Sequence, residues 1–478
     1  AKSFSKMATS IFACPFYFGL VTFFALATVL LKWLHSVQPK PYMDEIFHIP
    51  QAQHYCDGNF SHWDPMITTL PGLYLSSSLP LSIPGRLLFN KGDMFCTPYI
   101  LRCTNLFFST GNVALIFLLL NRMHPKMSSS YTFLVASTLG SFPMLYFFTF
   151  LYYTDAGSTF FTLLMYLLHL HHQTIPAALI GVIAILFRQT NIIWVVFMVG
   201  VSAQHTLLQW MAVQKKNLKT QRKHDWLLLH TFFNLFSVNL QRNPWVIVEL
   251  VLSILMKTWC YIIVTLLFLL FVYINNGIVV GDRSHHEVTF NFPQIYYFLS
   301  TVLFFASPHL ISFQKIYNWL SQSIQKPISF ITFSVISALL IAKFTYVHEY
   351  LLADNRHYTF YVWSKIFKRH YLVRFLLIPI YWYTICQVYL DLKKKNIFWK
   401  IAFAICITVS LVPQKLLEFR YFIIPYLLLR LNMPLPTPLS KMLLEFTVST
   451  FVNAITIYLF VYKTFTWPGV KDAQRFMW

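Results

Sequence analysis

Acidic residues are scarce in this chain: Asp and Glu fill only 16 of 478 positions, whereas Lys and Arg fill 37. Charged residues make up 11% of the sequence, hydrophobic residues 57% and aromatic residues 18%. Soluble globular domains carry about 25% charged residues, so this composition excludes a soluble globule. It predicts an all-α polytopic membrane protein.

Long apolar runs fill most of the sequence. A helix needs about 20 apolar residues to cross a hydrocarbon core of about 30 Å. About thirteen runs reach or approach that length, near residues 10–33, 98–121, 131–150, 156–172, 174–187, 190–208, 247–273, 293–313, 328–346, 373–391, 398–412, 420–430 and 442–462. No gap between them holds a soluble domain of ordinary size, so residues 1–478 are predicted to form one multi-span membrane domain.

The sequence also lacks the usual signs of cofactor chemistry. It has no Gly-rich phosphate loop, and its 17 His residues include no pair with zinc-ligand spacing. We therefore expect no metal and no cofactor. Basic cytosolic loops give a polytopic chain a positive net charge, here +21, so we expect membrane lipids and no nucleic acid as partners.

The distribution of charge predicts the topology. The first apolar run follows AKSFSK without a small-residue cleavage pattern, which indicates an uncleaved anchor entering from the cytosol. Alternate loops counted from that side carry 18 basic and two acidic residues, including a basic loop at 209–246 that can meet anionic headgroups. The opposite loops carry eleven of the 16 acidic residues. The side of the C-terminus stays open, because one error in the span count near 400–445 reverses it.

The acidic residues concentrate in a polar island at residues 41–76, PYMDEIFHIPQAQHYCDGNFSHWDPMITTLPGLYLS, within the predicted first non-cytosolic loop, 34–97. The island holds Asp44, Glu45, Asp57 and Asp64. Five further polar islands lie on the same predicted face, at 152–158, 187–191, 275–287, 348–363 and 413–422. Polar groups near span ends are costly unless they line a wet cavity or bind a ligand. The islands therefore predict the mouth of an enzyme.

The islands supply residues for transfer from a lipid phosphate to a hydroxyl. A carboxylate can deprotonate an acceptor hydroxyl, so Asp44 is the first candidate for the general base and Glu45 the second. Basic side chains can hold the leaving phosphate. The candidates for this role are Arg356, His357, Lys415 and Arg420. A lipid donor would reach the site through the bilayer, which agrees with the missing phosphate loop.

Other residues of the islands are candidates for binding the acceptor or its sugars. They are Trp63, Asp64, Tyr153, Asp155, Asp282, Arg283 and Asn355. Each assignment has a structural alternative. Asp44 can cap the helix expected over EIFHIPQAQHY, and Asp64 can shape the turn before Pro65. Arg356 can pair with Asp354 or Glu418. The aromatic residues also suit a membrane-interface belt, and Arg188 suits an interface anchor.

Two features of the first loop concern its compartment. Cys56 and Cys96 can form a disulfide if the loop faces an oxidising compartment, although the sequence gives no distance between them. Asn59-Phe60-Ser61 is an acceptor motif for N-glycosylation. It lies so near Asp44 in the sequence that the candidate site could block glycan attachment, and the sequence leaves the occupancy of Asn59 open.

Eight strings carry a family resemblance: YMDEIFHIPQAQHYCDG, WDPMITTLPGLY, FLYYTDAGS, FRQTNIIW, GDRSHHE, LLADNRHYTFYVW, VPQKLLEFRYFIIPY and QRFMW. Together they resemble the endoplasmic-reticulum alpha-1,2-glucosyltransferases that use dolichyl phosphate glucose, and they occur in order from about Tyr42 to Trp478. The resemblance implies a GT-C type glycosyltransferase fold with a luminal active site. It also implies a catalytic acid in the first luminal loop, which falls on Asp44 or Glu45.

The resemblance implies a reaction as well. Glucose would pass from dolichyl phosphate glucose to the dolichyl-diphosphate-linked oligosaccharide, forming its terminal alpha-1,2-glucose by an inverting, metal-independent displacement. The leaving phosphate needs charge stabilisation more than protonation, and Lys or Arg can supply it. Two other functions stay open on the residues alone. One is a non-catalytic transporter or channel-associated subunit with a polar vestibule, and the other is a mannosyltransferase of the same superfamily.

Overall fold

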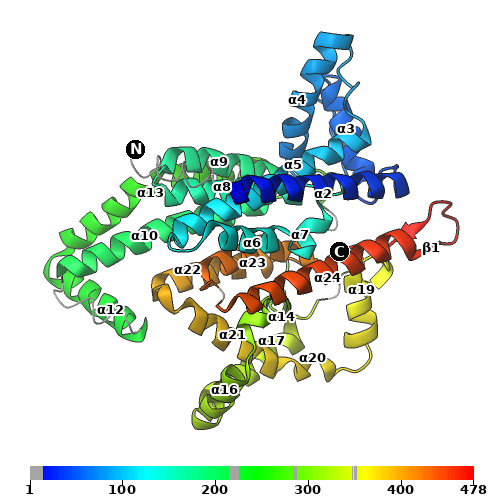
Figure 1. Ribbon diagram of the computed structural model, residues 1–478. Helices are drawn as coiled ribbons and strands as arrows, with labels where there is room; N and C mark the ends of the chain where they lie inside the picture. Colours follow the sequence, from blue (N-terminus) through cyan, green and yellow to red (C-terminus); the bar gives the residue numbers. More distant parts are fainter. Residues whose placement is uncertain (1–13, 215–224, 284–287, 347, 349–351, 436) are drawn as a thin grey trace.

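The computed structural model describes residues 14–214, 225–283, 288–346, 348, 352–435 and 437–478. This part of the chain is almost entirely helical, with one two-stranded sheet of β1 (Thr464–Phe465) and β2 (Gln474–Arg475) (Figure 1). Within it, seven helices are long and apolar enough to cross a membrane. They cover Pro15–Val37, Pro98–Met123, Gln189–Gln214, Pro244–Ile274, Pro327–Phe344, Val373–Lys394 and Leu439–Tyr462. The chain is therefore a multi-pass membrane protein.

Helices occupy all thirteen predicted apolar runs. Those that match the long spans are α2 (Cys14–Val37), α5 (Pro98–Met123), α10 (Ile192–Gln214), α13 (Pro244–Ile274), α17 (Pro327–Phe344), α20 (Val373–Leu376) with α21 (Ile378–Asp391), and α24 (Leu439–Tyr462). The other six runs hold shorter helices: α6 (Ser129–Gly140) with α7 (Pro143–Phe147), α8 (Asp155–Leu170), α9 (Thr174–Phe187), α14 (Pro293–Phe305) with α15 (Ser307–Leu310), α22 (Ile397–Leu411) and α23 (Ile423–Asn432). The runs therefore located the helices, while seven of them meet the length and hydropathy of a full span.

Proline sets where several of these helices begin. Helices α5, α7, α13, α14 and α17 each start with proline at their first position. That position suits proline because its missing N–H would have no partner inside the helix and its φ is already helical. Thr97 precedes α5 and accepts a hydrogen bond from the backbone N–H of Ile100. The chain thus turns back into the bundle at defined residues.

The first loop folds into a projecting helical pair. Helices α3 (Glu45–Cys56) and α4 (Gly72–Phe89) stand out from one corner of the bundle (Figure 1). A disulfide joins Cys56, the last residue of α3, to Cys96 just before α5, with a Cα–Cα distance of 6.6 Å. The pairing that the sequence left open is therefore formed. It fixes the end of α3 to the start of a long membrane helix.

Buried charges inside the bundle are paired. Glu445 of α24 accepts hydrogen bonds from Arg430 of α23 at 2.7 and 3.0 Å and also contacts His309 of α15. Removing one partner of such a buried ion pair is strongly destabilising, because it leaves an uncompensated charge. This cluster lies near the start of α24, whereas the polar islands gather at the other end of that helix.

The basic loop predicted at 209–246 is partly helical. Helix α10 continues to Gln214, and α12 (Asp225–Arg242) covers most of the remainder. Asp225 at the start of α12 contacts Lys400 of α22 and accepts a hydrogen bond from Tyr389 at 2.6 Å. Residues 215–224, which hold most of the predicted basic cluster, lie outside the described residues.

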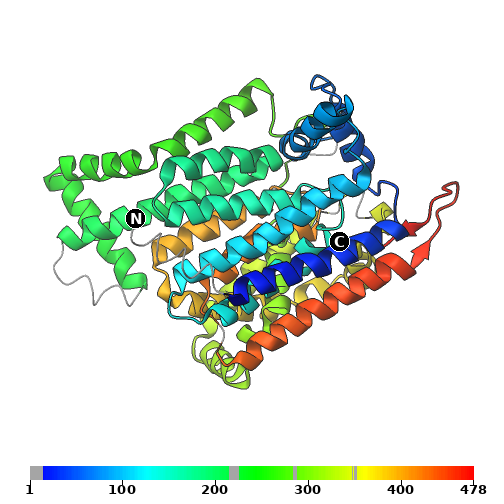
Figure 2. The same cartoon turned by 45° about the horizontal axis from the view of Figure 1, so that its top comes forward.

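Further short helical segments connect these helices. They include α16 (Phe313–Gln325) before α17, α19 (Tyr358–Tyr361) with η2 (Val362–Phe367) before α20, and η3 (Leu392–Lys394) after α21. Helices α2 and α24 run side by side toward the same end of the bundle (Figure 2). Arg475 of β2 donates to the carbonyls of Val37 and Phe460 at 3.2 and 2.8 Å. A cation at helix C-termini is favoured by the helix dipole, and here one side chain joins two such ends.

Candidate active site

The polar islands meet at one end of the bundle. The 275–283 loop pairs with the first loop through Val280 N–H to Thr68 C=O at 3.4 Å. Gln189, in the short helix η1 (Gln189–Asn191), donates its side-chain amide to the same carbonyl at 2.9 Å. Asn291 donates its backbone N–H to Val412 C=O at 2.8 Å, which ties the segment before α14 to the 413–422 island. Residues far apart in the sequence therefore border one polar region. Residues 284–287 and 349–351 of the islands lie outside the described residues.

Asp44 lies at the foot of the projecting helical pair. It occupies the N-cap position of α3, yet its side chain makes no capping hydrogen bond. The side chain is 44% exposed, and its Oδ2 lies 3.5 Å from Nη1 of Arg420. The capping alternative raised from the sequence therefore fails, because capping requires an acceptor bond to the N2 or N3 backbone N–H. The carboxylate is left open to solvent.

The backbone around Asp44 is held from both sides. Met43 has φ +56°, in the left-handed region that non-glycine residues rarely adopt. The phenolic oxygen of Tyr153 accepts the backbone N–H of Asp44 at 3.0 Å. Backbone strain of this kind persists only where surrounding contacts over-determine it. Tyr153 thus helps to hold the Asp44 carboxylate where it faces Arg420.

Glu45 has a different environment from its neighbour. Its side chain is fully buried and accepts four hydrogen bonds, from Nε and Nη2 of Arg102 at 2.9 and 2.6 Å and from the backbone N–H groups of Tyr42 and Tyr152 at 3.0 and 2.6 Å. Four bonds fill the acceptor sites of a carboxylate. Glu45 is therefore placed as a structural support for the loop, and the structure gives it no open face for an acceptor.

Arg102 completes this support. Its five N–H groups all find acceptors: the two bonds to Glu45, the carbonyls of Gln38 and Lys40 at 2.7 and 3.0 Å, and Nδ1 of His35 at 3.0 Å. Arg102 lies inside the apolar run 98–121, where the sequence analysis overlooked it. An arginine within a membrane span requires a partner. Its presence in this apolar run therefore indicated a buried ion pair.

Arg420 is oriented by Glu418. Both residues follow α22, and Arg420 lies in the short helix η4 (Phe419–Phe422). Nε and Nη2 of Arg420 bond the two carboxylate oxygens of Glu418, the second at 2.8 Å, so that Nη1 faces Asp44. Burial alone would raise the pKa of Glu418, but the charge and hydrogen bonds of Arg420 outweigh it and lower that pKa to about 2. Glu418 was not among the predicted site residues. Its position two residues before Arg420 could have indicated that the two side chains form an ion pair.

Asp155 and Arg188 form a second ion pair nearby. Asp155 begins α8 and is almost fully buried, and its Oδ1 lies 3.0 Å from Nη1 of Arg188. The two groups are close enough for an ion pair, but their geometry does not make a hydrogen bond. The Arg188 guanidinium lies 5.9 Å from the ring centre of Tyr421, the residue after Arg420. Arg188 therefore belongs to this polar region, and Asp155 is held by it and turned away from open solvent.

Arg356 lies in a network with the C-terminal tail. Its guanidinium bonds both oxygens of Asp354, at 2.9 and 2.7 Å, and Oε1 of Gln474 at 3.2 Å. It also lies 4.5 Å from the ring centre of Trp467, whose indole N–H donates to Asn355 at 2.9 Å. Arg356 thus pairs with Asp354, one of the two structural partners predicted as its alternative, and Asn355 accepts from Trp467.

The tail joins this network to the first loop. Met477 donates its N–H to the carbonyl of Arg356 at 2.9 Å, and Nδ1 of His357 lies 3.0 Å from the carbonyl oxygen of Trp478. The Tyr42 hydroxyl donates to the carbonyl of Arg475 at 2.6 Å. The tail therefore lies on the same face of the bundle as Asp44. The sequence had left the side of the C-terminus open. Lys415 is half-buried on the 413–422 island.

The remaining predicted residues lie in the first loop or in the 275–283 loop that pairs with it. Asp64 accepts the backbone N–H of Met66 at 2.9 Å, which makes the turn proposed as its alternative role. The indole N–H of Trp63 donates to the carbonyl of Ile67 at 3.3 Å. Asp282 is exposed and donates its backbone N–H to Pro65 C=O at 2.8 Å. Arg283 donates to the carbonyls of Asn275, Asn276 and Val279 at the end of α13.

Tyr153 does not offer a surface for sugar stacking. The residue is 1% exposed, and burial raises its pKa well above 10. Its ring packs against His48 and Phe148, with centroid distances of 5.9 and 5.0 Å. The expectation that it binds sugar conflicts with this burial, since stacking requires an open ring face. Its contact with the Asp44 backbone gives it a positioning role instead.

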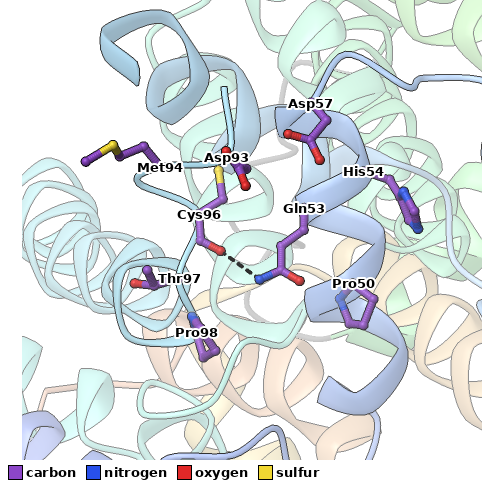
Figure 3. Close-up of a pocket in the computed structure, with 9 residues that line it drawn as sticks. All are labelled: Pro50, Gln53, His54, Asp57, Asp93, Met94, Cys96, Thr97 and Pro98. Carbon is purple, nitrogen blue, oxygen red and sulfur yellow. Dashed lines mark hydrogen bonds between the residues drawn. The ribbon is translucent and has the colours of Figure 1, made fainter. Parts of the chain in front are cut away.

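A cavity of about 540 Å³ opens beside α3 (Figure 3). It is lined by Pro50, Gln53, His54, Asp57, Asp93, Met94, Cys96, Thr97 and Pro98. Gln53 donates to the carbonyl of Cys96 at 3.1 Å. It follows Asp44 by nine residues, which turns it about 180° around a helix of 3.6 residues per turn. The cavity is therefore separate from the Asp44 site. Among the described residues, no group of three or more His, Cys, Asp or Glu side chains is placed to hold a metal ion.

Comparisons with known proteins cover nearly the whole chain. The DIE2/ALG10 family model matches residues 38–431, which include Asp44, Glu418 and Arg420. A Mus musculus protein named Dol-P-Glc:Glc(2)Man(9)GlcNAc(2)-PP-Dol alpha-1,2-glucosyltransferase is 46% identical over 464 residues, covering 95% of this chain and 97% of that protein. Proteins of the same name from Drosophila melanogaster and Arabidopsis thaliana are 34% and 31% identical, covering 91% and 95% of this chain and 93% and 99% of those proteins. No solved structure matches the chain. The matches extend from the first loop through the islands that meet around Asp44, and the chain belongs to the DIE2/ALG10 family.

Proposed function

We propose that this protein transfers glucose from Dol-P-Glc to Glc(2)Man(9)GlcNAc(2)-PP-Dol and forms an alpha-1,2 linkage. The names of its relatives support this donor and acceptor, because the chain and those proteins match over nearly their full lengths. A mannosyltransferase is less well supported, since the relatives are named for glucose transfer. A non-catalytic vestibule does not explain why the exposed Asp44 carboxylate faces Arg420, which Glu418 holds in place.

The observation that carries the mechanism is the half-exposed Asp44 carboxylate beside Arg420. Asp44 would accept the proton of the acceptor 2-hydroxyl as that oxygen attacks C1 of the donor glucose. The C1–O bond to phosphate breaks on the opposite side, and its electron pair leaves with dolichyl phosphate. A single displacement of this kind inverts the beta-linked donor to an alpha product. Asp44 is the carboxylate with the access that this step needs, because Glu45 is enclosed by four donors.

Arg420 is the best-placed candidate for the donor phosphate. Glu418 holds Nε and Nη2, which leaves the Nη1 corner facing the Asp44 side of the site. Guanidinium groups bind phosphate through charge-assisted hydrogen bonds and stabilise charge on a leaving oxygen. Arg188 lies in the same region and is a second candidate, while Lys415, His357 and Arg356 remain candidates from the sequence. Asp64 and Trp63 lie in the first loop and Asp282 bonds to it, so these residues are candidates for contact with a large glycan acceptor.

The membrane arrangement is part of the proposal. We place the chain in the endoplasmic reticulum membrane as a GT-C type enzyme with about thirteen membrane helices in one domain. The first loop, 34–97, would face the lumen and the 209–246 segment the cytosol. The Cys56–Cys96 disulfide supports this, because disulfides form in oxidising compartments. A cysteine placed at exposed Ala473 should react with a membrane-impermeant maleimide only after sealed microsomes are opened, since the tail lies on the Asp44 face.

The test is glucose transfer by the purified protein to a lipid-linked oligosaccharide that already carries two glucoses. Asp44→Asn should lower kcat about 10²–10⁴-fold, the usual contribution of a general base, while the protein stays folded. Asp57→Asn is the matched control, since Asp57 is an exposed acid at the other end of α3. It should keep its activity. EDTA in every reaction tests the expected metal independence.

The outcomes separate the alternatives. Full activity of Asp44→Asn would remove the base assignment but keep the transferase. Transfer of mannose from dolichyl phosphate mannose in preference to glucose would favour the mannosyltransferase. No transfer of either sugar by the folded, unmodified chain, even after divalent metal is added, would favour the vestibule.

A further inference from the structure

The chain contains a single N-glycosylation motif, Asn59-Phe60-Ser61, which the proposed chemistry does not use. It lies in the turn that follows α3, three residues beyond the disulfide-bonded Cys56. We propose that Asn59 is itself a site of N-glycosylation. This inference goes beyond the proposed transfer of glucose, and it rests on the luminal side proposed for the first loop.

The structure removes the steric objection that the sequence raised. Asp44 and Asn59 are 15 residues apart, but the 12-residue helix α3 separates them. A helix of that length extends about 18 Å, so the acceptor side chain lies roughly one helix length from the candidate base. Figure 1 shows that α3 projects from the corner of the bundle. The motif therefore stands away from the Asp44 site, near the disulfide that joins the end of α3 to the segment before α5.

The motif is also presented at the surface. Asn59 and Ser61 are both exposed, and the Ser61 hydroxyl donates to Oδ1 of Asn59 at 3.0 Å. The backbone N–H of Asn59 donates to His54 C=O at 2.9 Å, which fixes the turn to the last part of α3. Phe60 packs its ring against Tyr55 at 5.2 Å. The amide and hydroxyl that define the motif thus lie next to each other on a supported turn, with no cover from the bundle.

The compartment follows from independent observations. The disulfide at Cys56 indicates an oxidising environment, and the concentration of Lys and Arg in the alternate loops predicts that those loops are cytosolic and that the first loop lies on the opposite face. The required donor is an oligosaccharide linked to a lipid diphosphate, and an oligosaccharide-transferring enzyme must act on this chain. Nδ2 of Asn59 forms a bond to C1 of the sugar and loses one proton to that enzyme. The C1–O bond breaks, and its electron pair leaves with the lipid diphosphate.

The test uses the full chain expressed in cells that perform N-glycosylation. Treatment with an endoglycosidase should shift the unmodified protein to the mobility of Asn59→Gln, and peptide mass spectrometry should place the glycan on Asn59. Ser61→Ala should lose the glycan, whereas Ser61→Thr should keep it because the motif accepts either hydroxyl. Asn59→Gln should retain glucose transfer, since Asn59 lies far from Asp44.

An unmodified Asn59 peptide as the main species from folded protein, with mobility unchanged by the endoglycosidase, would overturn the proposal. A glycan that persists in both Asn59→Gln and Ser61→Ala would overturn it as well, because the modification would then be elsewhere. Glucose transfer is measured separately on the same preparations, so failure of the glycosylation proposal and failure of the transferase proposal are distinguishable.

Discussion

Glu45→Gln should destabilise the first loop instead of blocking a chemical step. The substitution removes the counter-ion of Arg102, whose side chain is 2% exposed, and it offers an amide N–H₂ to donors that need an acceptor. Breaking a buried ion pair by removing one partner costs about 3–5 kcal/mol. The free energy of unfolding should therefore fall by about that amount, with early proteolysis in the 57–71 loop.

A double-mutant cycle tests the origin of this effect. Arg102→Met alone should destabilise the protein to a similar degree, because it leaves the Glu45 charge without its cation. Glu45→Gln combined with Arg102→Met should cost clearly less than the sum, since no unpaired charge then remains buried. The assay is denaturant unfolding of the purified protein in detergent, with glucose transfer measured at a temperature where each variant is folded. Asp57→Asn, at the exposed end of α3, serves as the control.

Two results would refute this reasoning. Glu45→Gln with unchanged stability and lost turnover would make Glu45 a participant in the chemistry. Strictly additive costs in the cycle would mean that Glu45 and Arg102 do not act as a pair. Loss of activity that parallels loss of folded protein is the expected result.

Three further predictions concern other contacts. Arg420→Gln should raise KM for the lipid phosphate donor and lower kcat, while Arg420→Lys should restore part of both in steady-state kinetics; unchanged constants in both variants would exclude contact with the phosphate. Cys96→Ser should lower the free energy of unfolding by about 4 kcal/mol, because the Cys56–Cys96 disulfide closes a segment with a sequence separation of 40. Equal unfolding midpoints of the unmodified protein with and without reductant would contradict this. Burial lowers the pKa of His48 to about 4, whereas in the unfolded chain it is about 6.5. Between these two pH values only the unfolded chain binds the proton, so the free energy of unfolding should fall as the pH drops from about 6.5 toward 4. His48→Gln should flatten that pH dependence in thermal unfolding, and an equally steep profile would assign it to another group.

The sequence located the helices well and the contacts within the site less well. Apolar runs such as 98–121 and 442–462 mark helices because a membrane span needs a fixed length of apolar residues. The same runs hid Arg102 and its role, since its partner Glu45 lies 57 positions away. Sequence separation gives no information on such a pairing, and only the packing of α5 against the base of α3 brings the two charges together.

The two adjacent acids illustrate the same limit. Asp44 and Glu45 are chemically alike, and their positions in the sequence alone could only rank them. Successive residues of a helix point about 100° apart, so one carboxylate turns toward Arg420 and the other toward Arg102. Local preference made Asp44 a candidate to cap α3, but its side chain makes no capping hydrogen bond and lies 3.5 Å from the distant Arg420.

The sequence by itself determined the class of the protein, the helical segments, the acid-rich first loop and the family resemblance. These depend on composition, periodicity and ordered strings, which need no knowledge of distance. The tertiary structure decided which carboxylate is open, which cation faces it, that Cys56 and Cys96 pair and that Asn59 stands away from the site. Each of those depends on contacts between segments brought together by the packing of membrane helices, so only the folded chain specifies them.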